Sequence, residues 1–189
     1  MADTHIPDRV KTFHPELLPA LRAARPDLIL HAGDVSVPRV LEPLREIAPV
    51  EMARGNRDWA FRGQHGWVNQ LELSGVRVAL MHGHGSWFQY VIDKGIYFFQ
   101  GYRFERYLAI LLKAAQNARV IVYGHTHHAE KVWVGQQFIF NPGSASFGLG
   151  AAVSPGWGML SIYPAGRVEG EIFELRGYRV LQGEWVKVH

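Results

Sequence analysis

Several side chains able to bind a metal ion stand where apolar, strand-like segments of this chain end. The clearest group is Gly124-His125-Thr126-His127, which follows the apolar run 120–123 and carries two imidazoles one residue apart. The chain contains no cysteine, so a metal would be held by nitrogen and oxygen donors alone. The candidate donors, in chain order, are Asp3, His5, Asp34, Asn56, His82, His125 and His127.

These two carboxylates, one amide and four imidazoles are more donors than one ion needs. A single ion takes about four to six of them, so the set predicts two ions that share a bridging ligand. A carboxylate is the group best able to bridge, and Asp34 stands in the middle of the series. Two ions about 3.5–4 Å apart can hold a hydroxide between them and polarise a phosphoryl oxygen.

The elements that must position these donors alternate between helical and strand-like segments. Apolar periodicity predicts a helix that begins at His14 and two more over 38–47 and 102–117. It predicts strands at 28–32, 50–53, 71–73, 76–81, 120–123, 131–134, 137–140, 159–163 and 168–175. Because the carboxyl ends of strands in an open sheet share one crevice, the donors are expected to meet there. The order of elements predicts an α/β sandwich with mixed sheets.

Composition describes an ordinary globular protein. The 189 residues suit one domain, 1–189, with 48% hydrophobic and 20% charged residues. The formal net charge is +3 without a lysine or arginine run, so a nucleic-acid partner is not implied. A signal peptide and an apolar stretch of about 20 residues are both absent from the sequence, and the expected location is cytoplasmic.

Five motifs in a fixed order carry a resemblance to a known family. They are Asp3-Thr4-His5, Gly33-Asp34, Gly55-Asn56-Arg57-Asp58, His82-Gly83-His84 and Gly124-His125-Thr126-His127. On these motifs the chain resembles the calcineurin-like metallophosphoesterase superfamily, most closely its small single-domain prokaryotic phosphodiesterases. The resemblance ends near Asn141-Pro142-Gly143-Ser144, which it implies lines the active-site crevice. It also implies a four-layer α-β-β-α sandwich of two mixed sheets flanked by helices.

The resemblance implies how the donors are shared. One divalent ion would be bound by Asp3, His5, Asp34 and His127, and the second by Asp34, Asn56, His82 and His125. Mn²⁺ is the expected metal, with Fe, Co, Ni or Zn as alternatives. A metal-bridging hydroxide would attack the phosphorus of a small phosphate ester. The implied catalytic residues are Asp34, Asn56, Arg57 and His84.

Two features depart from the family pattern. Arg57 stands where many members have a histidine thought to protonate the leaving group, and a guanidinium cannot deliver a proton. It can bind phosphate oxygens, so we expect diesters or activated esters as substrates. In addition, only Met1-Ala2 precedes Asp3, so the usual first strand is missing or truncated. Either the start is truncated or some other contact holds Asp3 and His5, and since chain ends are usually poorly ordered, both are expected to be weak metal ligands.

Alternatives remain open. A binding or scaffold module on the same fold is one, because a eukaryotic retromer subunit resembles this superfamily in that way. A phosphomonoesterase is another, disfavoured by the absent histidine at position 57. The segment 86–102 carries seven aromatic residues. Three roles are open for them: packing in the core, a flap beside the metals, or a surface for homo-oligomer formation.

Overall fold

The computed structural model describes residues 1–61, 63, 65–84, 101–147 and 154–188. Its largest sheet has five strands in the order β3-β4-β5-β7-β6. The strands are β3 (Val68–Leu73), β4 (Val76–Met81), β5 (Val120–Val122), β6 (Glu130–Val134) and β7 (Gln137–Asn141). The three central strands are mutually parallel and the two edge strands are antiparallel to their neighbours, so the sheet is mixed.

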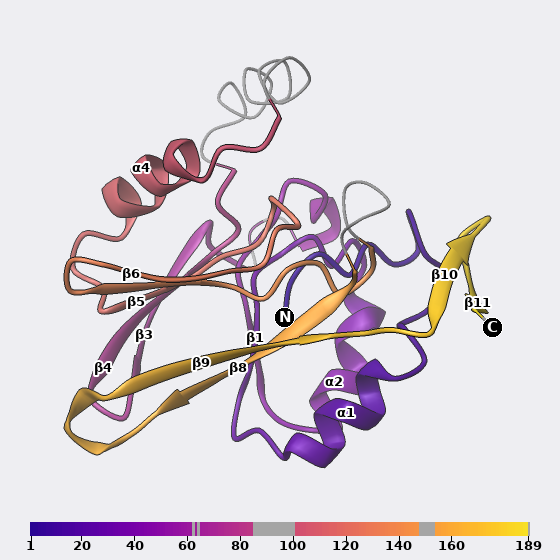
Figure 1. Cartoon of the computed structure of the whole chain (residues 1–189), viewed down its shortest axis with the longest axis horizontal. Coiled ribbons are helices and arrows are strands. Elements are labelled where there is room, and N and C mark those ends of the chain that lie inside the picture. The colour runs from indigo at the N-terminus through magenta and orange to yellow at the C-terminus, as the bar shows by residue number, and fades with distance from the viewer. Residues whose placement is uncertain (62, 64, 85–100, 148–153, 189) are drawn as a thin grey trace.

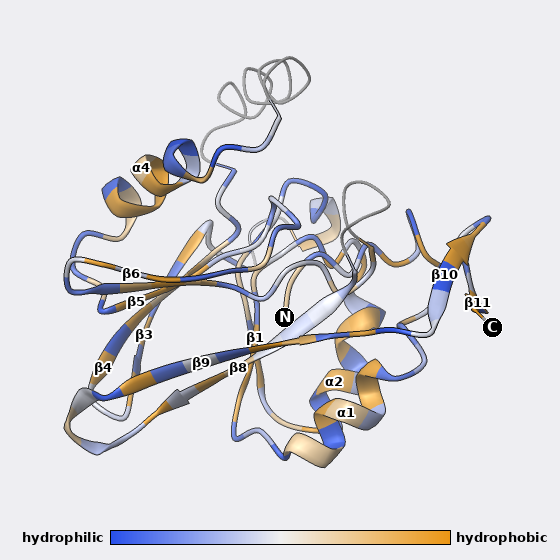
Figure 2. Ribbon diagram, in the orientation of Figure 1, coloured by the Kyte–Doolittle hydropathy of each residue, from blue (hydrophilic) through white to orange (hydrophobic). Residues whose placement is uncertain are grey.

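One face of this sheet is covered by α4 (Phe104–Ala114), as Figure 1 shows. Leu111 of α4 is fully buried against Met81, Ile121 and Ile139. Figure 2 shows apolar and polar residues alternating along α4, as expected of a helix with one face on a sheet.

The other face of the sheet packs on a second layer of strands. This layer contains a parallel pair, β1 (Ile29–His31) with β2 (Val50–Met52), and an antiparallel pair, β8 (Gly156–Ile162) with β9 (Val168–Glu174). Beyond it lie α1 (Leu17–Ala24) and α2 (Glu42–Arg45), which pack on the outer side of this layer (Figure 1). The predicted α/β sandwich of four layers is therefore confirmed, but only the five-stranded sheet is mixed: the second layer consists of a parallel pair and a separate antiparallel pair rather than a second mixed sheet.

The boundaries differ from the sequence prediction in identifiable places. The single helix predicted over 38–47 is a 3₁₀-helix (Pro38–Leu41) followed by α2, because Pro43 lacks the N–H that a continuous helix would direct to the carbonyl of Arg39. Short 3₁₀ turns span Trp59–Phe61 and Pro164–Gly166. The hairpin of β10 (Tyr178–Leu181) and β11 (Glu184–Lys187) was not predicted. Among the described residues, no helix is both long and apolar enough to cross a membrane.

The chain start makes backbone hydrogen bonds to β1 but is not itself a strand. The amino group of Met1 donates to Leu30 O (2.8 Å), and Ala32 N–H donates to Met1 O (2.9 Å). Burial lowers the pKa of that amino group to about 5, against a smaller opposing effect of Asp3. Residues 1–3 thus form a buried segment with strand-like hydrogen bonds to 30–33. The expected poor order of Asp3 and His5 is wrong, because backbone bonds to Gly33 O and Asp34 O fix both residues in the interior. That they are weak metal ligands stays a prediction.

Candidate metal centre

Three buried donors from distant parts of the chain meet at one point. The Nε2 atoms of His5 and His127 lie 3.2 Å apart. Asp3 Oδ1 is 3.8 Å from the first and 3.6 Å from the second. We call Asp3, His5 and His127 the amino-terminal cluster.

A second group of donors lies beside it. His82 Nε2 is 3.0 Å from Asn56 Oδ1. The ring of His125 meets that of His82 edge-on, with 5.0 Å between centroids. We call Asn56, His82 and His125 the strand-end cluster, because they follow β2, β4 and β5.

Asp34 lies between the two clusters and directs one carboxylate oxygen to each. Its Oδ2 is 3.7 Å from His5 Nε2, and its Oδ1 is 3.4 Å from His82 Nε2. Asp3, Asp34 and His82 also form a group whose ligand atoms all lie within 4.8 Å of one another. The structure thus brings all seven sequence-predicted donors to one region, while their assignment to ions stays a prediction.

The donor set fits metal ions on three observations. Asp3 Oδ1 is buried and has no hydrogen-bond partner among the described residues, which is costly unless a cation satisfies it. His82 Nδ1 donates to Ala32 O (2.7 Å), and His127 Nδ1 donates to Phe147 O (2.8 Å). A carbonyl only accepts, so Nδ1 carries a proton in both rings, and Nε2 is the atom that each ring turns toward the clusters, as metal binding requires.

The local electrostatics shift the pKa values of the donors in different directions. Burial would raise the pKa of Asp34, but the positive charges of His82 and His5 hold it below its usual range. Burial and the neighbouring His82 depress the pKa of His125, and burial also depresses that of His127. Burial alone would lower the pKa of His82, but the Asp34 carboxylate raises it to about 10. In the absence of metal, Asp34 and His82 therefore form a charged pair.

Five of the seven donors have a backbone conformation that side chains rarely adopt. Positive φ angles occur at Asp3 (54°), His5 (49°), Asp34 (56°), His125 (69°) and His127 (58°). Each left-handed residue with a Cβ atom costs about 1–2 kcal/mol. Strain concentrated on the donors is typical of a site whose geometry serves a function.

Two motif glycines are required by close approach. A Cβ atom on Gly55 would collide with the backbone N and the Oδ1 atom of Asp34. One on Gly124 would lie 2.8 Å from Asp3 Oδ2 and 2.8 Å from Ala2 Cβ. The glycines therefore let neighbouring segments pack tightly enough for the aspartates to reach the centre.

Residues outside the donor set hold it in shape. The Asp58 carboxylate accepts N–H groups from Asp34 (2.9 Å) and Gly55 (2.7 Å), as well as from Ser36 (2.8 Å). Ser144 and Ser146 donate hydroxyl bonds of 3.0 and 2.8 Å to the carbonyl of Asp3.

In the sequence, Asp58 belongs to one of the five motifs, and the resemblance implied 141–144 as crevice lining. Sequence reasoning missed Ser146, whose only signal was its nearness to that turn. Asn141 lies at this turn but uses its amide to bond Gly124 O and Thr126 Oγ1.

Arg57 and His84 lie at the edge of the centre. The Arg57 guanidinium forms a 2.8 Å ion pair with Asp8, a residue that carried no sequence signal, and its backbone N–H bonds Asp34 Oδ1 (2.9 Å). The His84 ring lies 5.3 Å from His82 and 4.6 Å from Trp67, centroid to centroid. Burial lowers the pKa of His84 to about 3, so it is neutral at pH 7.

The predicted aromatic segment can be placed only in part, because 86–100 fall outside the described residues. Tyr102 is described: it stacks on the His128 ring with 4.0 Å between centroids and donates a hydrogen bond to Glu130 (2.9 Å). The flap and the homo-oligomer surface stay predictions.

Comparisons with known proteins agree with this geometry. A family model described as the calcineurin-like phosphoesterase superfamily domain matches residues 1–159. A probable metallophosphoesterase of Methanothermobacter thermautotrophicus is 33% identical over 144 residues, which cover 76% of this chain and 74% of the relative.

Solved structures with the same fold include wild-type Vps29 of Entamoeba histolytica complexed with Zn²⁺. Its TM-score is 0.67 at 22% identity, covering 92% of this chain and 96% of that one. Another is a conserved uncharacterized protein of Streptococcus pneumoniae, described as a predicted phosphoesterase. Its TM-score is 0.58 at 21% identity, covering 100% of this chain and 94% of that one.

Proposed function

The chain belongs to the calcineurin-like phosphoesterase superfamily, and we propose that it is a binuclear metal-dependent phosphoesterase that prefers phosphodiesters. The observation that carries the proposal is the position of Asp34, whose two carboxylate oxygens face different clusters. A carboxylate in that position suits a bridge between two ions. The amino-terminal cluster would complete one ion's donors, and the strand-end cluster the other's.

The ions, when bound, would supply Lewis-acid chemistry: they lower the pKa of water and polarise phosphoryl oxygens. The chain's own residues do the rest. His5, His82, His125 and His127 would supply the nitrogen donors, and a metal at His82 would first displace the proton that the Asp34 carboxylate stabilises there. Asp58 and the two serines keep the aspartates from shifting, which matters because small displacements of a catalytic group are costly.

The preference for diesters rests on Arg57. Its guanidinium is partly exposed and carries a fixed positive charge that can hold a phosphate oxygen. It cannot protonate a leaving group at neutral pH. Substrates with good leaving groups, such as activated diesters, need that proton least.

The test is metal reconstitution. Protein stripped with a chelator is reloaded separately with Mn²⁺, Zn²⁺, Co²⁺, Ni²⁺ or Fe²⁺, and metal content is measured by elemental analysis. We expect about two ions per chain and hydrolysis of bis(4-nitrophenyl) phosphate with a kcat/KM at least about tenfold above that of 4-nitrophenyl phosphate, a difference of about 1.4 kcal/mol in transition-state stabilisation. His82→Ala should lose one ion and most activity. Full metal loading without turnover of either ester would contradict the proposal.

A second candidate is a metal-binding scaffold without catalysis. Two observations favour it: the engagement of Arg57 by Asp8 (2.8 Å), and the likeness of the fold to a Zn²⁺ complex of Vps29. This reading predicts two bound ions and no turnover, so the same experiment separates the two candidates.

A further inference from the structure

An exposed tryptophan lies close to the strand-end cluster. Trp67 directly precedes β3, and the antiparallel register pairs Val68 with Met81, the last residue of β4. The register therefore brings Trp67 to the end of β4 at which the donor His82 follows. Trp67 is 48% exposed, although tryptophan is highly buried on average.

One ring joins Trp67 to the donors. Measured between centroids, the His84 ring lies 4.6 Å from the Trp67 ring, 5.3 Å from the His82 ring and 5.9 Å from the His125 ring. His84 itself is buried. A single buried ring thus separates the exposed indole from two donors of the strand-end cluster, and a ligand held at this cluster can reach Trp67 with a short substituent.

The indole is held in place from the end of β2. The guanidinium carbon of Arg54 lies over the Trp67 ring, 3.9 Å from its centroid, which is a cation–π contact. Arg54 N–H also donates to Gly66 O (3.0 Å), and Asn69 Nδ2 donates to Met52 O (2.6 Å). The residues on either side of Trp67 are therefore tied to the end of β2. An aromatic side chain that is already fixed loses little conformational entropy when a ligand covers it.

The two arginines near the centre differ in their partners. Arg57 forms an ion pair with Asp8 (2.8 Å). Among the described residues, no carboxylate forms an ion pair with Arg54, and its buried Nε has no hydrogen-bond partner. A cation without a carboxylate partner favours an anionic ligand. Because a guanidinium and an indole both stack on flat rings, the pair suits an anion that carries an aromatic group.

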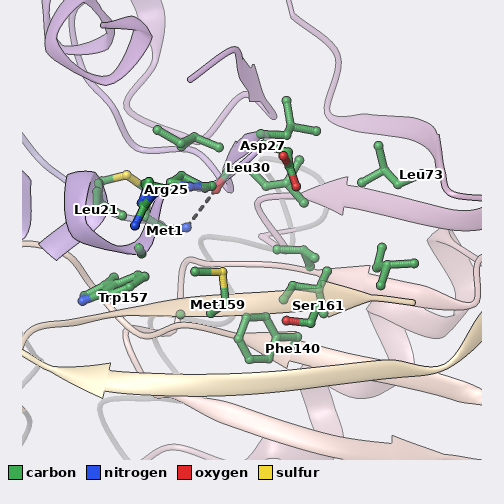
Figure 3. A pocket seen from close by; sticks show the side chains of 18 of the residues that line it. Met1, Leu21, Arg25, Asp27, Leu30, Leu73, Phe140, Trp157, Met159 and Ser161 are labelled. Carbon is green, nitrogen blue, oxygen red and sulfur yellow. Dashed lines mark hydrogen bonds between the residues drawn. The ribbon is translucent and has the colours of Figure 1, made fainter. Parts of the chain in front are cut away.

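A pocket elsewhere in the molecule does not serve this purpose. It has a volume of about 630 Å³ and lies between β1 and β8, where Figure 3 shows Leu30 and Met159 on opposite sides of it. Its lining contains none of the seven donors. A substrate whose phosphate lies at the donors would therefore place its substituents on side chains beside the centre, of which Trp67 is an exposed one.

We propose that Trp67, held by Arg54, is a subsite for a flat aromatic ring of the substrate, so that the preferred substrates are phosphodiesters with an aryl group or a nucleobase as one substituent. This inference rests on the proposed function in one respect, which is that the phosphate lies at the metal centre. Trp67 would determine specificity without taking part in the chemical step.

The test compares pairs of ligands that differ in the ring. Phenylphosphonate is set against methylphosphonate, neither of which has an ester bond to hydrolyse. Adenosine 5′-monophosphate is set against ribose 5-phosphate, which distinguishes a nucleobase from a simple aryl group as the source of the ring. Dissociation constants are measured by calorimetric titration of the metal-loaded chain, so the result does not depend on turnover of a diester.

Trp133→Ala is the matched control for Trp67→Ala. Trp133 is 44% exposed and also has a guanidinium over its ring, that of Arg119 at 4.7 Å. It pairs with Phe138 near the start of β7, at the opposite end of the large sheet from the donors that follow β4 and β5.

In the unsubstituted chain, at least one ring-bearing ligand should bind at least about fivefold tighter than its partner without the ring. Trp67→Ala should reduce this preference to within about twofold, whereas Trp67→Phe should keep part of it and Trp133→Ala all of it. The affinity for methylphosphonate should stay the same in every variant, because this ligand has no ring.

Two results would overturn the inference: no preference for either ring-bearing ligand in the unsubstituted chain, or an undiminished preference in Trp67→Ala. Diester hydrolysis is measured in parallel. A preference that depends on Trp67 in a metal-loaded chain without turnover would support the subsite and contradict only the proposed function.

Discussion

The two clusters differ in what positions their donors. Two donors of the amino-terminal cluster, Asp3 and His5, lie near the chain start, which makes strand-like hydrogen bonds but forms no strand. All three donors of the strand-end cluster lie in segments that follow strands. Asp3 depends on hydroxyl bonds from Ser144 and Ser146, far along the chain. His82 depends on the end of β4, in the middle of a packed sheet. The two clusters thus have equal numbers of donors, but a few hydrogen bonds position one and a packed sheet positions the other. Substitutions near them should therefore affect their metal binding differently.

The largest effect should come from the residue that the clusters share. Asp34→Asn removes the charge and one of the two oxygens that face them, so neither ion keeps its full donor set. We expect metal content to fall well below two per chain and diester hydrolysis to drop at least about 10³-fold, at the upper end for loss of a single stabilising group. Asp27→Asn, the same change at an exposed residue, is the matched control. Two tightly bound ions in Asp34→Asn would show that this carboxylate does not bridge.

A smaller and one-sided effect should follow from weakening the support of Asp3. Removing both hydroxyls in Ser144→Ala/Ser146→Ala leaves the Asp3 carbonyl without its two side-chain donors. Loss of such supporting contacts typically costs about 10–100-fold in metal affinity. Calorimetric titration should show one site weakened by that factor and the other unchanged.

Ser154→Ala, at an exposed serine, should titrate like the unsubstituted chain. Equal loss of affinity at both metal sites in the double variant would mean that Ser144 and Ser146 position the donors of both clusters.

The same contrast explains what could be predicted from the sequence. The donors of the strand-end cluster follow apolar strands that periodicity identifies, so both the strands and the crevice were predictable. The Asp3-Thr4-His5 motif identified Asp3 and His5 as donors, but the sequence did not predict that they are buried. It arises from hydrogen bonds with 33–34 and 144–146, and no local pattern encodes contacts across more than 140 residues. Asp8 was missed for the same reason, since its partner Arg57 lies 49 positions away.

A modest effect is expected from the ion pair of Asp8 with Arg57. Asp8 holds the Arg57 guanidinium at 2.8 Å, and both side chains are about one-third exposed, so the pair contributes about 1 kcal/mol or less. Asp8→Asn frees the guanidinium and removes a negative charge that repels phosphate. KM for a diester should fall by up to about fivefold while kcat stays within about twofold, because the change affects ground state and transition state alike. A raised KM would indicate that Asp8 positions Arg57 for substrate rather than competing for it.

The smallest effect concerns His14, a buried histidine that belongs to neither cluster. Its Nδ1 accepts a bond from Glu16 N–H (3.1 Å), and its ring lies edge-on to Trp185 with 4.7 Å between centroids. Burial lowers the pKa of His14 below 6.5, so folding favours the neutral ring. The stability this contributes is complete above the unfolded-state value of 6.5 and is lost as pH falls from there through the folded-state value.

His14→Asn keeps a hydrogen-bond acceptor for Glu16 N–H without a titrating ring. The fall in Tm between about pH 7.5 and pH 5 should therefore be shallower in this variant than in the unsubstituted chain, both measured with chelator present. Because the cluster histidines titrate in both proteins, their contribution cancels in the comparison. An equal fall in Tm in the two proteins would contradict this prediction. It would mean that the loss of stability at low pH comes from the clusters and not from His14.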